Sequence, residues 1–336
     1  MATAPRLSAA EMAQAFGRNA AARAATPAAR IWLALGTVYL LWGSTYLGIK
    51  FSIETIPPLL MGSLRFLAAG GVLFLLASRG RRVEGDRLGA PQWRATLLIG
   101  ALLLVGGNGG VILAEQYVPT GIVALLVATA PLWMAVLDRL IFGRRLPALA
   151  IVGLVIGFVG VGFLIGAPGP GRIKLIGAAL ALAAPICWAT GSVLSRHVPL
   201  PRRQLLSSAM EMTWAGTVFA VLSVATGELA RVHVDRISTT SVVAIIYLVI
   251  FGSLVGFSAY AWLLRAAPLS LVSTYAYVNP VVAVILGSIF LGEAITGRTV
   301  VAGGIILAAV ALIVIARNRA GAATPAPARP AVPSQP

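Results

Sequence analysis

The chain has few charged residues and a single cysteine, and both scarcities exclude classes of protein. Charged side chains make up 11% of its 336 residues, whereas a soluble globular protein has about 25%. Hydrophobic residues make up 59%, so the composition indicates a polytopic membrane protein. Cys187 lies inside an apolar run and has no second cysteine to pair with, so an intramolecular disulfide is excluded.

Motifs for metal, nucleotide and redox chemistry are also missing. The sequence contains no HExxH, no Asp-rich diphosphate motif, no Walker A and no CxxC pair. The two histidines, His197 and His233, fall in predicted loops. We therefore expect no metal site, no cofactor and no enzymatic activity. Without a nucleotide site, any uphill transport has to use an ion gradient.

The charges that are present are mostly basic and give a formal net charge of +16. They lie in short loops between apolar runs, a pattern that sets membrane topology and argues against a nucleic-acid-binding groove. With the N-terminus placed in the cytoplasm, 19 of the 26 Lys and Arg residues fall on the cytoplasmic side and five on the other side. This asymmetry predicts that both termini are cytoplasmic.

Ten apolar runs are long enough to span a bilayer, which needs about 20 residues. They are residues 31–53, 58–77, 95–115, 119–141, 148–166, 175–195, 205–226, 240–264, 270–291 and 299–316. Two tails flank them, and both are predicted to be disordered and cytoplasmic. The predicted organisation is a tail over 1–29, five helices over 30–166, five helices over 173–316 and a Pro/Ala-rich tail over 317–336.

Several residues of the first half have counterparts in the second half at a fixed offset along the sequence. At 146 residues the pairs are Trp42 with Trp188, Lys50 with Arg196, Arg65 with Glu211 and Gly70 with Gly216. At 149 residues they are Pro119 with Pro268, Pro131 with Pro280 and Gly143 with Gly292. Because five is odd, two such copies cross the membrane in opposite senses, as in alternating-access transporters. We predict an all-α membrane protein of ten transmembrane helices, built as two inverted five-helix repeats.

Four segments carry a resemblance to a known family. They read LLWGSTYLGIK (40–50), PPLLMGSLRFLAAG (57–70), AEQYVPTGIVALLVATAPLW (114–133) and APLSLVSTYAYVNPVVAVILGSIFLGEAITG (267–297). Together they resemble the EamA-type branch of the drug/metabolite transporter superfamily over about residues 31–316. The resemblance implies a multi-pass protein of the inner membrane that moves small metabolites such as amino acids, usually outward. It implies no particular substrate.

Two charged residues inside the predicted spans need a reason to be there, because each costs about 2.5–3.5 kcal/mol on insertion scales. Arg65 would lie roughly 10 Å below the outer surface, and Glu211 roughly 9 Å in from the cytoplasm. Arg65 is suited to a substrate carboxylate, whereas Glu211 is suited to an amine or a coupling proton. The alternative is that each snorkels or pairs with a helix end. Near the outer surface, Lys50 is expected to snorkel and Glu115 to be solvated.

Aromatic and amide side chains supply the remaining candidates for substrate binding. Trp42 and Trp188 are predicted near mid-depth, where the two repeats meet. The full set of predicted substrate-binding residues is Trp42, Tyr46, Arg65, Asn108, Trp188, Glu211, Trp214, Tyr260, Tyr275 and Asn279. The alternative for the aromatic residues is bulky packing.

Two repeat-related prolines are candidate hinges. Pro131 and Pro280 lie within predicted spans, where a proline frees a backbone carbonyl and bends the helix. They are either pivots for gating or static bends. The glycines around Asn108, at 106–110, either pack closely against neighbouring helices or loosen the helix beside a cavity.

These patterns favour a secondary transporter for a small metabolite, working by alternating access with possible proton coupling at Glu211. The partners expected are a small-molecule substrate and the lipid bilayer, with a monomer or a homodimer equally open. Two alternatives from other classes remain: a membrane-embedded enzyme acting on a lipid-like substrate, and a passive channel. The scattered acidic residues argue against the enzyme.

Overall fold

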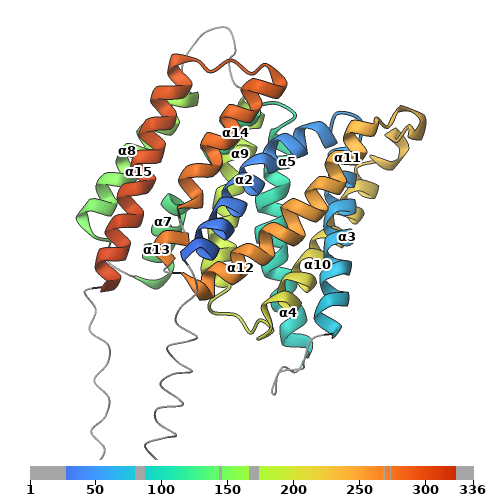
Figure 1. Ribbon diagram of the computed structural model, residues 1–336, viewed down its shortest axis with the longest axis horizontal. Coiled ribbons are helices and arrows are strands. Elements are labelled where there is room, and N and C mark those ends of the chain that lie inside the picture. The colour runs from blue at the N-terminus through green and yellow to red at the C-terminus, as the bar shows by residue number, and fades with distance from the viewer. Residues whose placement is uncertain are drawn as a thin grey trace, which may run out of the picture.

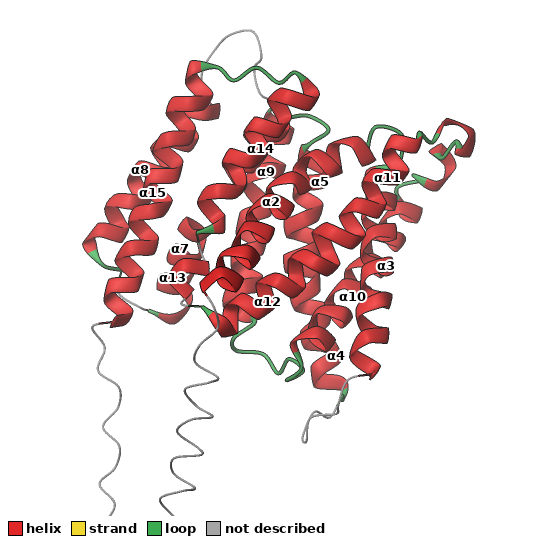
Figure 2. Ribbon diagram, in the orientation of Figure 1, coloured by secondary structure: helices red, strands yellow, loops and turns green. Residues whose placement is uncertain are grey.

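The structure is a computed structural model that describes residues 28–79, 88–143, 146–165, 174–267, 269–272 and 274–322. Nearly all of the predicted tail 1–29, and residues 323–336 of the other tail, lie outside these ranges. Every regular element in the described part of the chain is a helix (Figure 2). The last helix continues to Ala322, beyond the predicted end of the tenth span.

Nine helices of the described residues are long and apolar enough to cross a membrane. Six of them are continuous helices: α2 (Ala28–Ser52), α3 (Pro58–Arg79), α8 (Ala148–Ile165), α9 (Leu175–Leu194), α10 (Gln204–Ala225) and α15 (Gly297–Ala322). Such helices suit a bilayer because they satisfy their own backbone hydrogen bonds.

The remaining crossings are divided into segments. One consists of α4 (Ala90–Gly100), η1 (Ala101–Asn108) and α5 (Gly109–Ala114), and the next of α6 (Thr120–Val127) and α7 (Ala130–Phe142). In the second half, α11 (Thr239–Tyr247), η4 (Leu248–Val255) and α12 (Gly256–Ala266) form another crossing. The predicted ninth span contains a short helix, α13 (Leu269–Val272), followed by α14 (Tyr275–Leu291), which has only 17 residues. Two 3-10 turns, η2 (Leu229–Arg231) and η3 (Val234–Arg236), connect α10 to α11.

Local sequence explains several helix ends. Gly143 ends α7 and Gly292 ends α14, both in the left-handed conformation with φ of 65°, which glycine adopts at the lowest cost. These two glycines are repeat counterparts, so the two halves end these helices in the same way. Ser238 caps α11 by accepting a 3.1 Å hydrogen bond from the backbone N–H of Ser241.

Helices pack in pairs that follow the repeat. α3 packs along α10 at one edge of the molecule, and α8 packs along α15 at the opposite edge (Figure 1). Each pair joins equivalent helices of the two halves. Between them, α2 packs on α14, as α9 packs on α7. In the same way α2 packs on α12, as α9 packs on α5. This correspondence is what a two-fold relation between the halves requires.

The α3–α10 interface is close enough to exclude a methyl group at two related positions. A Cβ on Gly70 would lie 2.8 Å from the backbone nitrogen of Thr213, and a Cβ on Gly216 would lie 2.7 Å from that of Leu67. Since Leu67 and Thr213 are also separated by 146 residues, the two contacts are the same contact made from each side. Small residues permit such backbone approach between membrane helices.

Both π-helical segments occupy equivalent places. η1 and η4 are each eight residues long and lie in corresponding crossings of the two halves. The η1 segment covers Gly106, Gly107 and Asn108, within the stretch for which a loosened helix was one of two expectations. Pi-helical bulges inside α-helices are frequent at functional sites.

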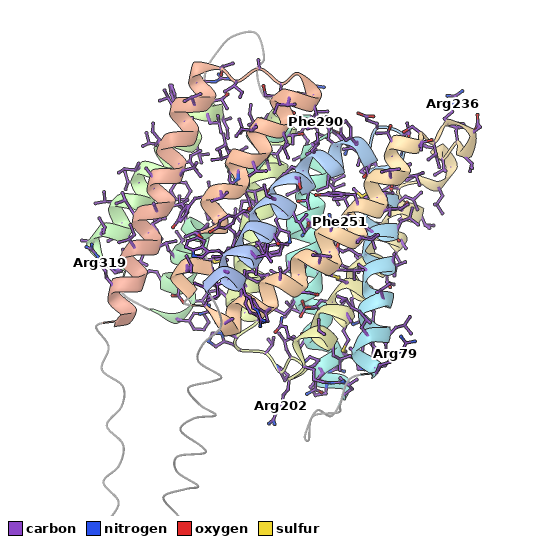
Figure 3. All side chains as sticks on the ribbon, viewed as in Figure 1. Arg79, Arg202, Arg236, Phe251, Phe290 and Arg319 are labelled. Carbon is purple, nitrogen blue, oxygen red and sulfur yellow. The ribbon has the colours of Figure 1, made fainter. Side chains whose placement is uncertain are left out.

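Labelled arginines identify the two ends of the molecule. In Figure 3, Arg79 and Arg202 lie at the lower edge and Arg319 lies at the left near the lower end of α15, whereas Arg236 lies at the opposite end. We call the first the Arg79 end. The opposite end, where α2 ends after Lys50, is called the Lys50 end.

Candidate substrate-binding site

Three of the predicted residues meet in one aromatic cluster. Trp42, near the middle of α2, packs against Tyr260 of α12 at 5.0 Å between ring centroids and against Tyr275 of α14 at 5.3 Å. Tyr260 and Tyr275 also contact each other edge to face at 5.7 Å. Phe257 completes the cluster at 5.8 Å from Trp42. Such edge-to-face and tilted geometries are the ones that aromatic rings prefer.

Backbone and amide groups fix the edges of this cluster. Trp42 Nε1 donates to the carbonyl oxygen of Gly252 at 3.3 Å. The Asn279 side chain is buried and lies 3.2 Å from the carbonyl oxygens of Tyr275 and Tyr39, within reach of its amide. The hydroxyl of Tyr39 forms a hydrogen bond with that of Thr274. Because these bonds join α2 to elements of the second half, the cluster lies where the two halves meet.

Arg65 is buried, with 5% of its surface exposed, and it reaches Gly252, whose carbonyl oxygen accepts from Trp42 of this cluster. Its Nε donates to Ser253 Oγ in η4 at 3.2 Å, and its Nη2 lies 3.4 Å from the position that a Cβ on Gly252 would take. Its Nη1 has no hydrogen-bond partner among the described residues. The guanidinium also lies 4.9 Å from the Phe66 ring centroid. A buried guanidinium with a free donor is suited to binding an anion.

The other predicted residues lie outside the cluster. Trp188, half-buried on α9, has its ring against Gly107 of η1, near Asn108 at the end of that segment. Tyr46 is one turn beyond Trp42 on α2 and packs on the main hydrophobic core. On α10, Trp214 contacts Trp93 at 6.0 Å.

Glu211 is buried in a separate place. Its Oε1 accepts a 2.7 Å hydrogen bond from Ser207 Oγ, one turn earlier on α10. A Cβ on Gly100 of α4 would lie 2.6 Å from the Glu211 carbonyl oxygen, so this part of α10 is tightly packed. Its contacts are thus with α4 and its own helix, whereas those of Arg65 are with η4.

The two candidate hinge prolines differ in their surroundings. Pro131 follows directly on a break between α6 and α7, at residues 128 and 129. Pro280 lies inside the continuous helix α14. The break before α14 comes earlier, before Tyr275.

One expectation about the Lys50 end needs correction. Glu115 was expected to be solvated, but its exposure is 0%. Glu115 lies at the end of α5, but neighbouring segments cover it completely. Lys50 is half-buried, and its Nζ donates to the backbone carbonyl of Glu115 at 2.6 Å.

Sequence reasoning missed two carboxylates that join the halves. Glu293, in the loop after α14, accepts from the backbone N–H groups of Thr120 at 2.6 Å and Gly121 at 3.0 Å. Glu228 accepts from those of Leu59 at 3.3 Å and Leu60 at 2.9 Å. Each caps the start of a helix in the first half from a loop of the second half. A helix start has unpaired N–H groups, but nothing in the sequence says which distant acid reaches them.

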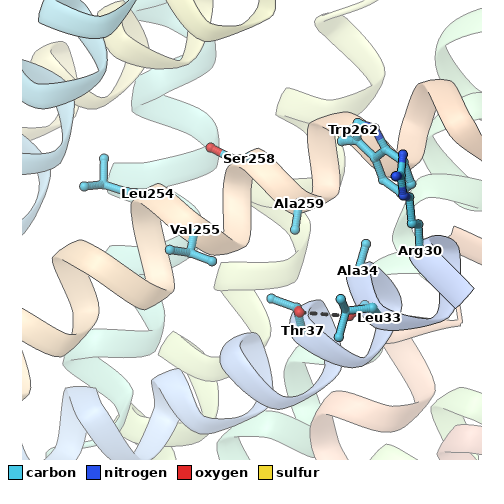
Figure 4. Close-up of a pocket in the computed structure, with 9 residues that line it drawn as sticks. All are labelled: Arg30, Leu33, Ala34, Thr37, Leu254, Val255, Ser258, Ala259 and Trp262. Atoms are coloured by element: carbon cyan, nitrogen blue, oxygen red, sulfur yellow. Dashed lines mark hydrogen bonds between the residues drawn. The ribbon is translucent and has the colours of Figure 1, made fainter.

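A shallow pocket of about 510 Å³ opens beside the aromatic cluster. It lies between the Arg79-end half of α2 and the segment from Leu254 to Trp262, with Arg30 beside Trp262 at its rim (Figure 4). Its lining is mostly apolar: Leu33, Ala34, Thr37, Leu254, Val255, Ser258 and Ala259, with Arg30 and Trp262. Leu33 is 73% exposed, so the pocket is on the outer surface of the bundle.

Metal chemistry has no support in the part of the chain that the structure describes. No group of three or more His, Cys, Asp or Glu side chains gathers there. Cys187 is free and packs near Gly106. The arrangement is suited instead to holding an organic molecule, with rings for an apolar body and a guanidinium for an anionic group.

Comparison with known proteins is consistent with this geometry. The model of the EamA-like transporter family matches residues 30–166 and again 175–315. The inner membrane transporter YedA of Escherichia coli K12, itself uncharacterized, is 40% identical over 286 residues, covering 84% of this chain and 90% of YedA. The "Probable amino-acid metabolite efflux pump" of Salmonella typhimurium is 26% identical, covering 81% of this chain and 90% of the pump. One crystal structure has the same fold, with a TM-score of 0.59 and 21% identity, covering 85% of this chain and 98% of that one.

A helical bundle with two matched halves defines the chain as a membrane transporter, not an enzyme. More particularly, it belongs to the EamA-like transporter family, whose model matches both halves. It is a multi-pass protein of the inner membrane.

Proposed function

We propose that the protein is a secondary transporter that exports a small amphipathic metabolite, an amino acid or a related compound, by alternating access. The observation that carries the proposal is the buried Arg65 with its free Nη1, which Gly252 links to the ring cluster of Trp42, Tyr260 and Tyr275. The guanidinium would bind a carboxylate and the rings an apolar side chain. The efflux pump of Salmonella typhimurium, named for amino-acid metabolites, supports this substrate class.

Alternating access is supported by the arrangement of the two halves. We propose that they are inverted five-helix repeats with both termini in the cytoplasm, so that the Lys50 end faces outward. At that end, the side chains of Glu228, Glu293 and Ser241 form hydrogen bonds with backbone groups of the first half. The conformation would then be closed to the outside, and export would require these bonds to break.

Glu211 is our candidate for proton coupling. It is buried, and its hydrogen bond to Ser207 is to a neutral hydroxyl. A buried carboxylate without a positive partner favours its protonated form. Protonation at one stage of the cycle and release at another would couple transport to a proton gradient.

The test uses the purified full-length protein in phospholipid vesicles with a panel of amino acids and a pH gradient. We expect saturable, pH-driven accumulation of at least one compound, and counterflow of labelled substrate without a gradient. Glu211→Gln should keep counterflow but lose the response to pH. The matched control is Glu54→Gln, which alters an exposed glutamate at the end of α2.

Other outcomes would reject separate parts of the proposal. Flux that rises linearly with concentration and shows no counterflow would indicate a channel. An unchanged pH response in Glu211→Gln would remove Glu211 from the coupling role while leaving the carrier intact. Transport of cationic compounds without a carboxylate would argue against Arg65 as the anchor.

A further inference from the structure

The Lys50 end contains a second buried carboxylate, Glu115, whose surroundings differ from those of every other acid described above. Its exposure is 0%, and neither Oε1 nor Oε2 has a hydrogen-bond partner among the described residues. By contrast, Glu228 is 5% exposed but accepts two backbone N–H groups and the Ser223 hydroxyl. Glu293 accepts two backbone N–H groups. Glu115 alone of these three has no donor.

The nearest cation does not supply the missing donor. Lys50 Nζ approaches Glu115 but donates to its backbone carbonyl at 2.6 Å, away from the carboxylate. The titratable groups that interact electrostatically with the Glu115 carboxyl are Lys50 and Tyr46 on α2 and Glu293 after α14. Lys50 favours the ionised form, whereas Glu293 opposes it by like-charge repulsion. The N–H groups of Thr120 and Gly121 hold Glu293 in this position.

An ionised carboxylate in such a place would be a buried charge with no hydrogen bond. That state costs several kcal/mol, and the group avoids the cost by taking up a proton. When protonated, Glu115 is neutral, and the only remaining cost is that of a hydroxyl without a hydrogen-bond partner. We propose that Glu115 is a proton-binding site, occupied while the Lys50 end is closed and emptied to the solvent on that side when it opens.

This site would add a step to the transport cycle, so the inference rests on the proposed function. Opening the Lys50 end would separate Glu293 from α6 and admit water to Glu115. The carboxyl would then release its proton to water and become free to pair with Lys50. Closing would require the proton to return, because the burial that expels water also removes solvation from the carboxylate. The bond made and broken is only the O–H bond of Glu115.

The first test reads the protonation state directly and needs no substrate. Infrared spectra of the full-length protein in phosphatidylcholine vesicles at neutral pH resolve the C=O stretch of protonated carboxyl groups from ionised carboxylate bands. We expect Glu115→Gln to remove a protonated-carboxyl band that wild type shows. Glu228→Gln, the matched control, should leave that band unchanged, because the Glu228 carboxylate already accepts hydrogen bonds from two backbone N–H groups and the Ser223 hydroxyl. The proposal would be overturned if Glu115→Gln lost none of the protonated-carboxyl bands of wild type, or if Glu228→Gln lost one.

A second test uses the wild-type chain, in case the Glu115→Gln variant does not fold. A hydrophobic carbodiimide reacts with protonated carboxyl groups buried in membrane proteins, and mass spectrometry locates the modified residue. We expect modification at Glu115 and none at Glu228. Modification absent from Glu115 would contradict the site.

Failure here is distinguishable from failure of the proposed function. If vesicles transport an amino acid while Glu115 is ionised and unreactive, the carrier stands and this proton site falls. If Glu115 is protonated but no transport occurs, the proton site stands and the substrate class is wrong.

Discussion

Arg65 places a planar guanidinium with several N–H donors in a buried site. Nε is occupied by Ser253 and Nη1 is free. A bidentate guanidinium matches a carboxylate in a way that a lysine ammonium does not. Replacing Arg65 therefore tests whether binding needs the planar guanidinium or only a positive charge.

We expect Arg65→Lys to weaken binding of a carboxylate substrate about 10-fold and Arg65→Met to weaken it about 100-fold, since a hydrogen bond to a charged group contributes about 1.5–3 kcal/mol. The measurement is the half-saturating concentration for counterflow in vesicles. Arg79→Lys at the exposed end of α3 serves as the control. Equal affinities in wild type and Arg65→Met would exclude Arg65 from the site.

Glu228 makes a different kind of contribution, because its role is structural. Replacement by Ala leaves the N–H groups of Leu59 and Leu60 without an acceptor at the start of α3. An unsatisfied buried donor costs about 1–3 kcal/mol, so the melting temperature in detergent should fall by about 4 °C or more. As the control, Glu54→Ala removes an exposed acid from the same end and should leave the melting temperature unchanged. A melting temperature equal to wild type for Glu228→Ala would show that the cap is not needed.

At the scale of elements, the α3–α10 pair depends on two glycines facing each other across the interface. A methyl group on Gly70 would meet the Thr213 backbone nitrogen at 2.8 Å, and backbone cannot move aside as a flexible side chain does. The neighbouring Gly71 has nothing within 4 Å of the same position. Substituting these adjacent glycines one at a time therefore separates the effect of packing on stability from the effect of helix propensity.

We expect Gly70→Ala to destabilise the protein by about 1–3 kcal/mol through overpacking. Gly71→Ala should be neutral or slightly stabilising, because alanine favours helix over glycine. Thermal melting in one detergent compares the two variants. If Gly70→Ala had the same melting temperature as Gly71→Ala, the close approach of α3 and α10 would be unnecessary for stability.

Repeat-related glycines have the same structural role in the two halves, whereas repeat-related prolines do not. Gly143 and Gly292 share an offset in the sequence and both end helices in the left-handed conformation. Pro131 and Pro280 share the same offset, yet one follows a break and the other lies in a continuous helix. A glycine's backbone freedom acts locally, whereas the effect of a proline depends on whether neighbouring helices support the bend.

At the scale of the whole molecule, the proposed orientation predicts which end is accessible from outside the cell. Arg236 and Arg79 lie at opposite ends of the bundle and both are exposed (Figure 3). In a Cys187→Ser background, Arg236→Cys should react with a membrane-impermeant thiol reagent in intact cells. Arg79→Cys should react only after the membrane is permeabilised. The reverse pattern would invert the topology and place the Lys50 end in the cytoplasm.

The sequence by itself determined the number of apolar runs, the two-part repeat and the family, because membrane solubility and helix length act on each segment separately. It also placed Trp42, Arg65 and Glu211 inside spans. Only the tertiary structure decided that Trp42, Tyr260, Tyr275 and Asn279 meet, since they come from α2, α12 and α14.

The acids show most clearly what the sequence left open. Glu115, Glu228 and Glu293 all lie at or just beyond helix ends, yet two receive backbone donors and one receives none. Whether a carboxylate is solvated, capped or isolated depends on which distant helix covers it. That is a property of packing, because burial and hydrogen bonding arise between segments far apart in the chain.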